Sequence, residues 1–154
     1  MNLIGKKIKN LAVKLTNVRS RVGTEEEAQV AEEVYKYLEK LEYFKENPEQ
    51  LFYHDVEDDL GRKSVVAVLK GEQEKSNDDT VVLLGHIDTV GIEDYGDLKE
   101  YATQPEVLKE KLREKQLSED VKEDLESGDW IFGRGLFDMK TGVAAHMILI
   151  EELS

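Results

Sequence analysis

The chain is 154 residues long, with 40% hydrophobic and 36% charged residues, a composition typical of a folded domain with a real core. Its formal net charge of −13 argues against nucleic acid and anionic membrane as partners, because both attract basic surfaces. The chain has no cysteine, so disulfides are excluded and any bound metal must take nitrogen and oxygen ligands.

The N-terminal third has the hydrophobic spacing of amphipathic helices. Apolar residues recur every three or four positions over residues 3–19, which predicts a first helix. Thr24 with Glu27 three positions later has the pattern of a capping box and predicts the start of a second helix. This second helix should end before Pro48.

Three short runs in the middle of the chain predict strands. Residues 51–56 and 64–69 are rich in β-formers and flank a polar turn around Gly61, which predicts a hairpin. Residues 71–79 are polar and turn-like. The unbroken apolar run at residues 80–84 predicts a strand covered on both faces, as in the centre of an α/β sheet.

The C-terminal half is predicted to be mostly helical. Residues 93–128 are rich in charge and predict a surface excursion with one or two helices, the second running from Ser118 to near Gly128. Residues 130–132 predict a short returning strand, and residues 140–153 an apolar helix. Helices and strands in this order indicate a layered α/β architecture.

One candidate metal ligand lies where the predicted central strand ends. Ligands of α/β proteins gather at the carboxyl ends of strands, and His86 directly follows this one. A neutral imidazole at that position can bind a divalent ion. Asp88 is two residues on, so in an extended chain its carboxylate lies on the same side and can accept the other imidazole N–H. A purely structural histidine is the alternative for this spacing taken alone.

A second candidate ligand follows a glycine-rich turn. Gly133 and Gly135 bracket Arg134, and this sequence lets the backbone turn sharply before Asp138 and the apolar helix. Taken alone, an aspartate at this point is a helix N-cap. A carboxylate there can also bridge two metal ions about 3.5–4 Å apart that polarise a carbonyl and activate water.

Together, the segments G-H-I-D-T-V at residues 85–90 and G-R-G-L-F-D-M-K at residues 133–140 resemble the paired signature of the zinc-dependent amidohydrolases and exopeptidases. That family includes aminoacylase, acetylornithine deacetylase, succinyl-diaminopimelate desuccinylase and glutamate carboxypeptidase. Residues 22–25 also resemble its N-terminal region. The acidic stretch at residues 93–128 is most similar to the arginine-utilisation branch of the family.

The resemblance implies a fold, a cofactor and residue roles. The implied fold is a three-layer catalytic domain in which helices flank a mixed β-sheet. His86 would bind one zinc ion, Asp88 would orient the imidazole as a catalytic-site residue, and Asp138 would bridge two zinc ions, with cobalt or manganese as alternatives. The Asp138–Met139 peptide bond would be cis. Arg134 matches the motif and is interpreted, like Lys140, as structural or electrostatic.

The family's remaining site residues have no matching position in this chain. The family's general base and second zinc ligand come from an adjacent Glu-Glu pair further downstream, and a further carboxylate and a second histidine follow later. Glu151-Glu152 lies too close to Asp138 for this spacing, and neither His54 nor His146 belongs to a motif. We therefore expect residues 1–154 to be the N-terminal part of a catalytic domain, with residues 93–128 as a helical insertion, and inactive alone.

The expected function is hydrolysis of an amide or peptide bond next to a free carboxylate, with a small acylated or peptidyl amino acid as substrate. A role in arginine or amino-acid catabolism is implied only by the similarity to the arginine-utilisation branch of the family. The alternative is a non-catalytic remnant or interaction module of the same fold. A serine hydrolase is disfavoured because the sequence has no G-x-S-x-G motif.

A cytoplasmic location is the expectation because no apolar run is long enough for a membrane span or signal peptide. Unpaired strand edges predict a homo-oligomer.

Overall fold

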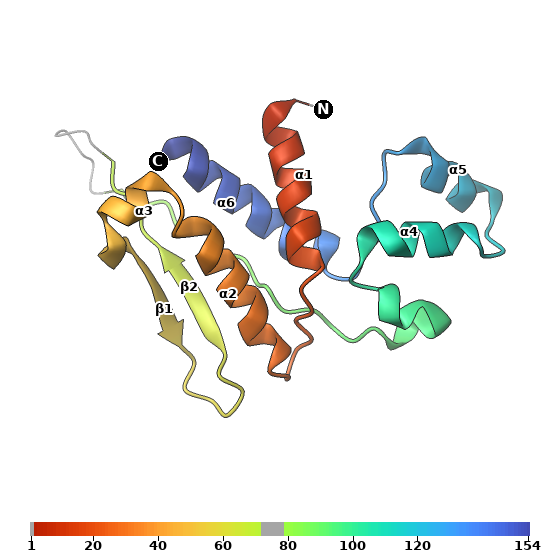
Figure 1. The fold of residues 1–154 in the computed structure, drawn as a ribbon, viewed down its shortest axis with the longest axis horizontal. Helices are drawn as coiled ribbons and strands as arrows, with labels where there is room; N and C mark the ends of the chain where they lie inside the picture. Colours follow the sequence, from red (N-terminus) through yellow and green to blue (C-terminus); the bar gives the residue numbers. More distant parts are fainter. Residues whose placement is uncertain (1, 72–78) are drawn as a thin grey trace.

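The computed structural model describes residues 2–71 and 79–154, so most of the turn predicted at residues 71–79 lies outside the described residues. The chain forms helices and a small antiparallel hairpin in a mixed α and β arrangement (Figure 1). The elements are α1 (Leu3–Thr16), α2 (Glu26–Leu38), α3 (Glu42–Glu46), β1 (Leu51–Asp55), β2 (Lys63–Ala67), α4 (Pro105–Arg113), α5 (Glu119–Ser127) and α6 (Thr141–Leu153), with 3-10 turns at Pro48–Gln50 and Glu93–Tyr101.

The predicted capping residues lie at the start of α2. The Thr24 hydroxyl accepts a hydrogen bond from the Glu26 N–H at 3.3 Å, and the Glu27 carboxylate accepts one from the Gly23 N–H at 2.6 Å. The helix ends at Leu38, before Pro48 as predicted, and Leu41 adopts an extended backbone between α2 and the separate α3.

The hairpin predicted from residues 51–69 is confirmed. β1 and β2 pair antiparallel, with Leu51 opposite Ala67 and His54 opposite Ser64. The Tyr53 ring stacks on Tyr35 of α2 with ring centroids 4.4 Å apart. This contact, together with the burial of Leu51, places one face of the hairpin against α2.

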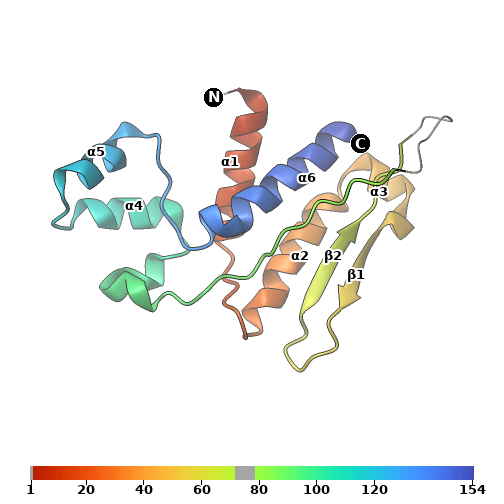
Figure 2. The same cartoon turned by 180° about the vertical axis from the view of Figure 1, so that it is seen from behind.

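The predicted central strand at residues 80–84 is wrong for this structure. Among the described residues, the only sheet is the two-stranded β1–β2 hairpin, and Val81 and Leu84 are 85% and 80% exposed. Figure 2 shows the segment as an unpaired trace that runs alongside α6. A strand exists only when a neighbouring backbone supplies the hydrogen-bond partners, and none is positioned here. The strand predicted at residues 130–132 is absent from the described residues for the same reason.

The core forms where α1, α2 and α6 meet one another and the hairpin. α6 begins one residue after the predicted start and contacts α1 along its length. Apolar side chains from all these elements are buried together: Leu11, Ala12, Leu15, Val34, Leu38, Phe44, Leu51, Leu136, Val143, Ala144, Met147 and Ile148. Within residues 2–71 and 79–154, no helix has the length and apolar character needed to cross a membrane.

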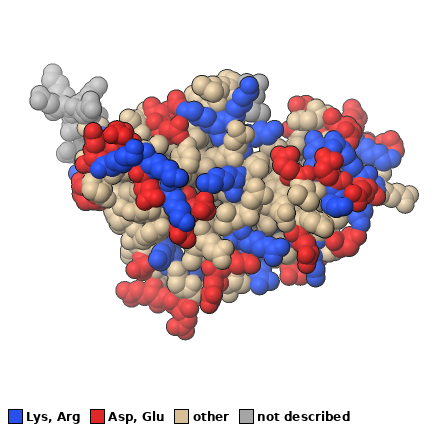
Figure 3. Space-filling view, in the orientation of Figure 1, with Lys and Arg blue, Asp and Glu red and all other residues tan. Residues whose placement is uncertain are grey.

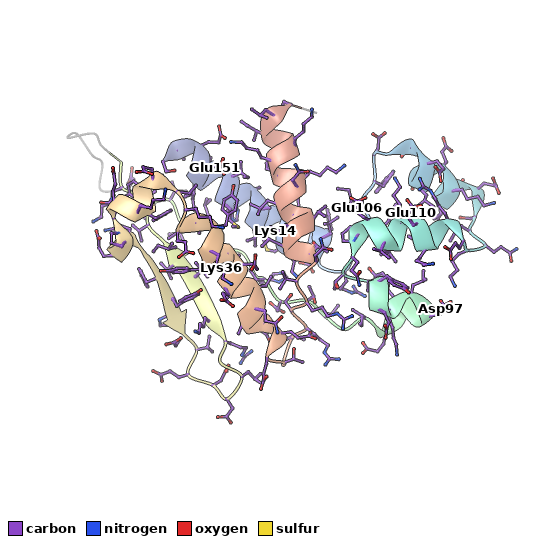
Figure 4. The ribbon with its side chains drawn as sticks, in the orientation of Figure 1. Lys14, Lys36, Asp97, Glu106, Glu110 and Glu151 are labelled. Atoms are coloured by element: carbon purple, nitrogen blue, oxygen red, sulfur yellow. The ribbon has the colours of Figure 1, made fainter. Side chains whose placement is uncertain are left out.

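The helices α4 and α5 form a lobe that lies beyond α1 and outside this core (Figure 1). Leu108 of α4 and Leu125 of α5 are both buried, and Arg113 of α4 donates to Glu126 of α5 at 2.8 Å. Figure 4 labels Glu106 and Glu110 on α4. Figure 3 shows acidic and basic side chains interspersed over the lobe, with no continuous basic face on this side.

Candidate metal site

The two sequence-predicted metal ligands lie side by side. His86 Nε2 is 2.8 Å from Asp138 Oδ1, although the two residues are 52 positions apart in the chain. Both side chains are accessible, with 45% of the His86 and 83% of the Asp138 side chain exposed. The structure therefore brings an imidazole and a carboxylate together at an open surface, where a small ligand can reach both.

Asp88 lies on the opposite side of the same ring. His86 Nδ1 is 3.2 Å from the Asp88 carbonyl oxygen and 3.3 Å from Asp88 Oδ1. Both ring nitrogens thus face oxygen acceptors. The hydrogen bond to Asp138 is the largest cause that raises the pKa of His86 above 6.5; partial burial opposes it, and the Asp88 carbonyl and the two carboxylate charges add to it. An ion at Nε2 would replace the proton there and leave Nδ1–H to donate to Asp88.

The loop that contains His86 and Asp88 is fixed by backbone hydrogen bonds to the loop between α1 and α2. The Thr89 N–H donates to the Ser20 carbonyl at 2.8 Å, and the Val22 N–H donates to the Thr89 carbonyl at 2.8 Å. Thr89 itself is buried and packs against Gly135. This packing connects the two motifs directly.

The turn that presents Asp138 is fixed by a buried lysine. Lys140 is fully buried, and its Nζ donates to the Val18 carbonyl at 2.7 Å. Burial is the main cause that lowers the pKa of Lys140 to about 8, and the nearby Asp88 and Glu26 carboxylates partly oppose it. The Thr141 hydroxyl donates to the Leu136 carbonyl at 2.6 Å. The Asp138–Met139 peptide bond is cis, as the resemblance implies.

A cleft of about 90 Å³ opens at this site. It is lined by His86, Asp88, Thr89, Val90, Arg134, Gly135 and Asp138. Two ligands of one tetrahedral zinc ion lie about 3.3 Å apart at ordinary bond lengths. The exposed Asp138 side chain needs to move by only about half an ångström to reach that spacing, so the imidazole and carboxylate fit two positions of a metal site.

Among the described residues, no third side chain joins His86 and Asp138 as a possible metal ligand. In the described parts of the chain, no group of three or more His, Cys, Asp or Glu side chains is positioned to hold a metal ion. His54 lies exposed on β1 and His146 lies on α6 beside Gly85. Glu151 accepts hydrogen bonds from Lys7 and Tyr37, so it ties α6 to α1 and α2 and is structural.

Arg134 is a residue of this site whose surroundings the sequence did not predict. Its guanidinium pairs with Asp94, lies 5.1 Å from the Tyr95 ring centroid and lines the cleft. Its backbone N–H donates to the Ala102 carbonyl at 2.6 Å. The start of the acidic excursion therefore positions Arg134, which is itself a lining residue of the cleft. Arg134 is charged and lies inside a glycine-bracketed turn, but its partners are about 40 residues away in sequence and have no pattern of their own.

Two curated proteins of Bacillus subtilis (strain 168) are similar to this chain. Protein RocB is 37% identical over 142 residues, which is 92% of this chain and 25% of RocB. Uncharacterized protein YqjN is 39% identical over 143 residues, again 92% of this chain and 25% of the relative. The chain spans about a quarter of the length of these curated relatives. No family model and no solved structure matches the chain.

Proposed function

We propose that this chain supplies the first half of the metal site of a zinc-dependent amidohydrolase or exopeptidase. The complete enzyme would cleave an amide or peptide bond next to a free carboxylate. One observation supports this above all others: His86 Nε2 meets Asp138 Oδ1 at 2.8 Å while Asp88 faces the other ring nitrogen. These three residues belong to the two motifs that resemble the family.

In this proposal, His86 and Asp138 hold zinc and Asp88 fixes the imidazole. Zinc, when bound, polarises a substrate carbonyl and makes water a better nucleophile. The Asp88 acceptor keeps the Nδ1 proton in place, so Nε2 presents its lone pair to the cleft. Arg134, neutralised on one side by Asp94, adds a positive wall to the same cleft.

The remaining ligands and the general base are proposed to come from the region in which the relatives are longer. A catalytic zinc site uses three protein ligands, and the described residues bring two together. We propose the same origin for the rest of the sheet, because the implied three-layer fold needs more strands than β1 and β2. A role in arginine or amino-acid breakdown is proposed on the branch resemblance alone.

Zinc titration of the chain, with a competing chelator, tests the proposal. The wild-type chain should bind zinc, and His86→Ala and Asp138→Asn should each weaken binding by about tenfold or more. Asp88→Asn should weaken binding by about tenfold, because it removes the group that orients the ring. His54→Ala is the matched control, since His54 is exposed on β1 away from the cleft.

Hydrolysis assays test whether the site is only half complete. The zinc-loaded 154-residue chain should turn over N-acylated amino acids and dipeptides at background rates. Robust hydrolysis by this chain alone would contradict the half-site, and equal zinc affinity of wild type and His86→Ala would contradict the metal site itself.

A non-catalytic module of the same fold is the second candidate. It is favoured by the absence of a three-ligand group among residues 2–71 and 79–154. Zinc affinity separates the candidates, because a module without the chemistry has no reason to bind zinc through His86 and Asp138.

A further inference from the structure

A second cleft, of about 110 Å³, lies next to the candidate metal cleft. It is lined by Arg19, Ser20, Arg21, Glu26, Thr89, Ile92 and Thr103. These residues come from the loop between α1 and α2, the first turn of α2, the loop after Asp88 and the chain just before α4. Thr89 lines both clefts, so the two share a wall.

The charge of this cleft is opposite to that of the chain as a whole. Two arginines line it against one glutamate, in a chain with a formal net charge of −13. Glu26 is already engaged, because its carboxylate accepts a hydrogen bond from the Arg21 backbone N–H at 3.2 Å. The lining itself carries two positive charges against one negative charge, and Glu93, which lies beside Arg21, is outside it.

The two guanidiniums retain most of their hydrogen-bonding capacity. Arg19 Nη2 donates one long bond, 3.4 Å, to the Glu100 carbonyl. Arg21 Nη1 lies 3.9 Å from Glu93 Oε1, which is an ion-pair distance and too long for a hydrogen bond. A guanidinium has five N–H donors in a geometry that matches a carboxylate. Both side chains can therefore donate hydrogen bonds to a further anion.

A buried hydroxyl at the same cleft also lacks a partner. Ser20 is 1% exposed, and its Oγ makes no hydrogen bond within the described residues. Its Oγ is shielded from solvent, as is the unpaired Thr16 Oγ1, so it takes no part in the proposed binding. The backbone on either side is held by the hydrogen bonds between Ser20, Val22 and Thr89.

We propose that this cleft is a binding site for a small carboxylate, held by the guanidiniums of Arg19 and Arg21. Its volume is several times the roughly 10–15 Å³ that a single water requires. Because the cleft adjoins His86 across Thr89, it suits the free carboxylate of a substrate whose amide lies at the metal cleft. This assignment to a substrate rests on the proposed function, whereas carboxylate binding itself does not.

NMR titration of the metal-free, full 154-residue chain with acetate tests the site, with chloride at equal ionic strength as the reference anion. Acetate should shift the backbone amide signals of Arg21, Thr89 and Thr103 in a saturable way, and chloride should not. Equal shifts with both anions, or shifts only on the α4–α5 lobe, would overturn the site. The chain is stripped of metal before the titration, so a failure of zinc binding or hydrolysis leaves this result intact.

Substitutions of Arg19 and Arg21 test whether their guanidiniums hold the carboxylate. Arg21→Gln and Arg19→Gln should each weaken acetate binding at least threefold, and Arg21→Lys should also weaken it because the forked donor is lost. Glu93→Gln should strengthen binding, since it removes the nearest competing carboxylate. Arg113→Gln, which changes an exposed arginine of α4, is the control. Unchanged acetate affinity in the two folded Lys and Gln variants of Arg21 would overturn the proposal.

Discussion

Gly135 shows at the scale of one residue why the second motif needs its glycine. Its φ is +79°, a region that side-chain-bearing residues rarely adopt, and a Cβ there would overlap Thr89 Cγ2. Thr89 follows Asp88 directly, so the space beside Gly135 lets the two motifs pack together. The glycine is therefore required by backbone shape and by close approach at once.

We expect Gly135→Ala to destabilise the chain more than Gly23→Ala, a control with nearly the same φ of +75° and open space around it. The control should cost about 1–2 kcal/mol for the left-handed backbone. Gly135→Ala should cost at least about 1 kcal/mol more, because Thr89 must move. Urea unfolding measures both, and equal losses would show that the contact with Thr89 is unimportant.

Glu151 gives a pH-dependent prediction at the same scale. Its pKa lies below 4.5 in the folded chain, first because Lys7 donates to it and then because Tyr37 does. A lowered carboxyl pKa stabilises the fold at pH values above 4.5, and this stabilisation disappears as the pH falls through the lower folded-state pKa. Replacing Glu151 by Gln should therefore reduce the free energy of unfolding by about 1 kcal/mol at pH 7, and by nothing at a pH well below the folded-state pKa of Glu151. Urea unfolding at both pH values checks this, and a pH-independent difference would contradict it.

At the scale of helices and strands, the sequence predicted the helices and the hairpin but not which other segments pair as strands. The helices around Leu11, Val34, Met147 and Leu125 and the hairpin were predicted because hydrophobic spacing and turn residues act over a few positions. Residues 80–84 and 130–132 were predicted as strands from composition alone. Strand formation also requires a partner backbone, which these short runs do not encode.

The unpaired segment at residues 80–84 leads to a prediction about association. Val82 and Leu84 are 69% and 80% exposed on a chain segment that no described strand pairs with. Such an apolar edge is open to a second copy of the chain, so we expect concentration-dependent self-association. The double variant Val82→Lys with Leu84→Lys should reduce it in light scattering, while Val121→Lys on α5 should not. A wild-type chain that stays monomeric at high concentration would contradict this.

At the scale of the whole molecule, the convergence of the two motifs is the part of the site that followed from the resemblance. Neither the spacing of His86 and Asp88 nor the glycine-rich turn alone predicts that His86 and Asp138 meet, because that contact depends on the Thr89 and Lys140 anchors. The ion pair between Arg134 and Asp94 and the cleft at Arg19 and Arg21 were not predicted. Both are assembled from segments distant in sequence, and such contacts have no local signature.

In the proposed site, one zinc ion binds between the His86 imidazole and the Asp138 carboxylate. Anomalous diffraction at the zinc edge, from crystals of the chain grown or soaked with zinc, locates the ion directly. We expect an anomalous peak in contact with His86 Nε2 and an Asp138 carboxylate oxygen. A peak only at His54, His146 or the Glu151 carboxylate, or no peak beside His86, would contradict it.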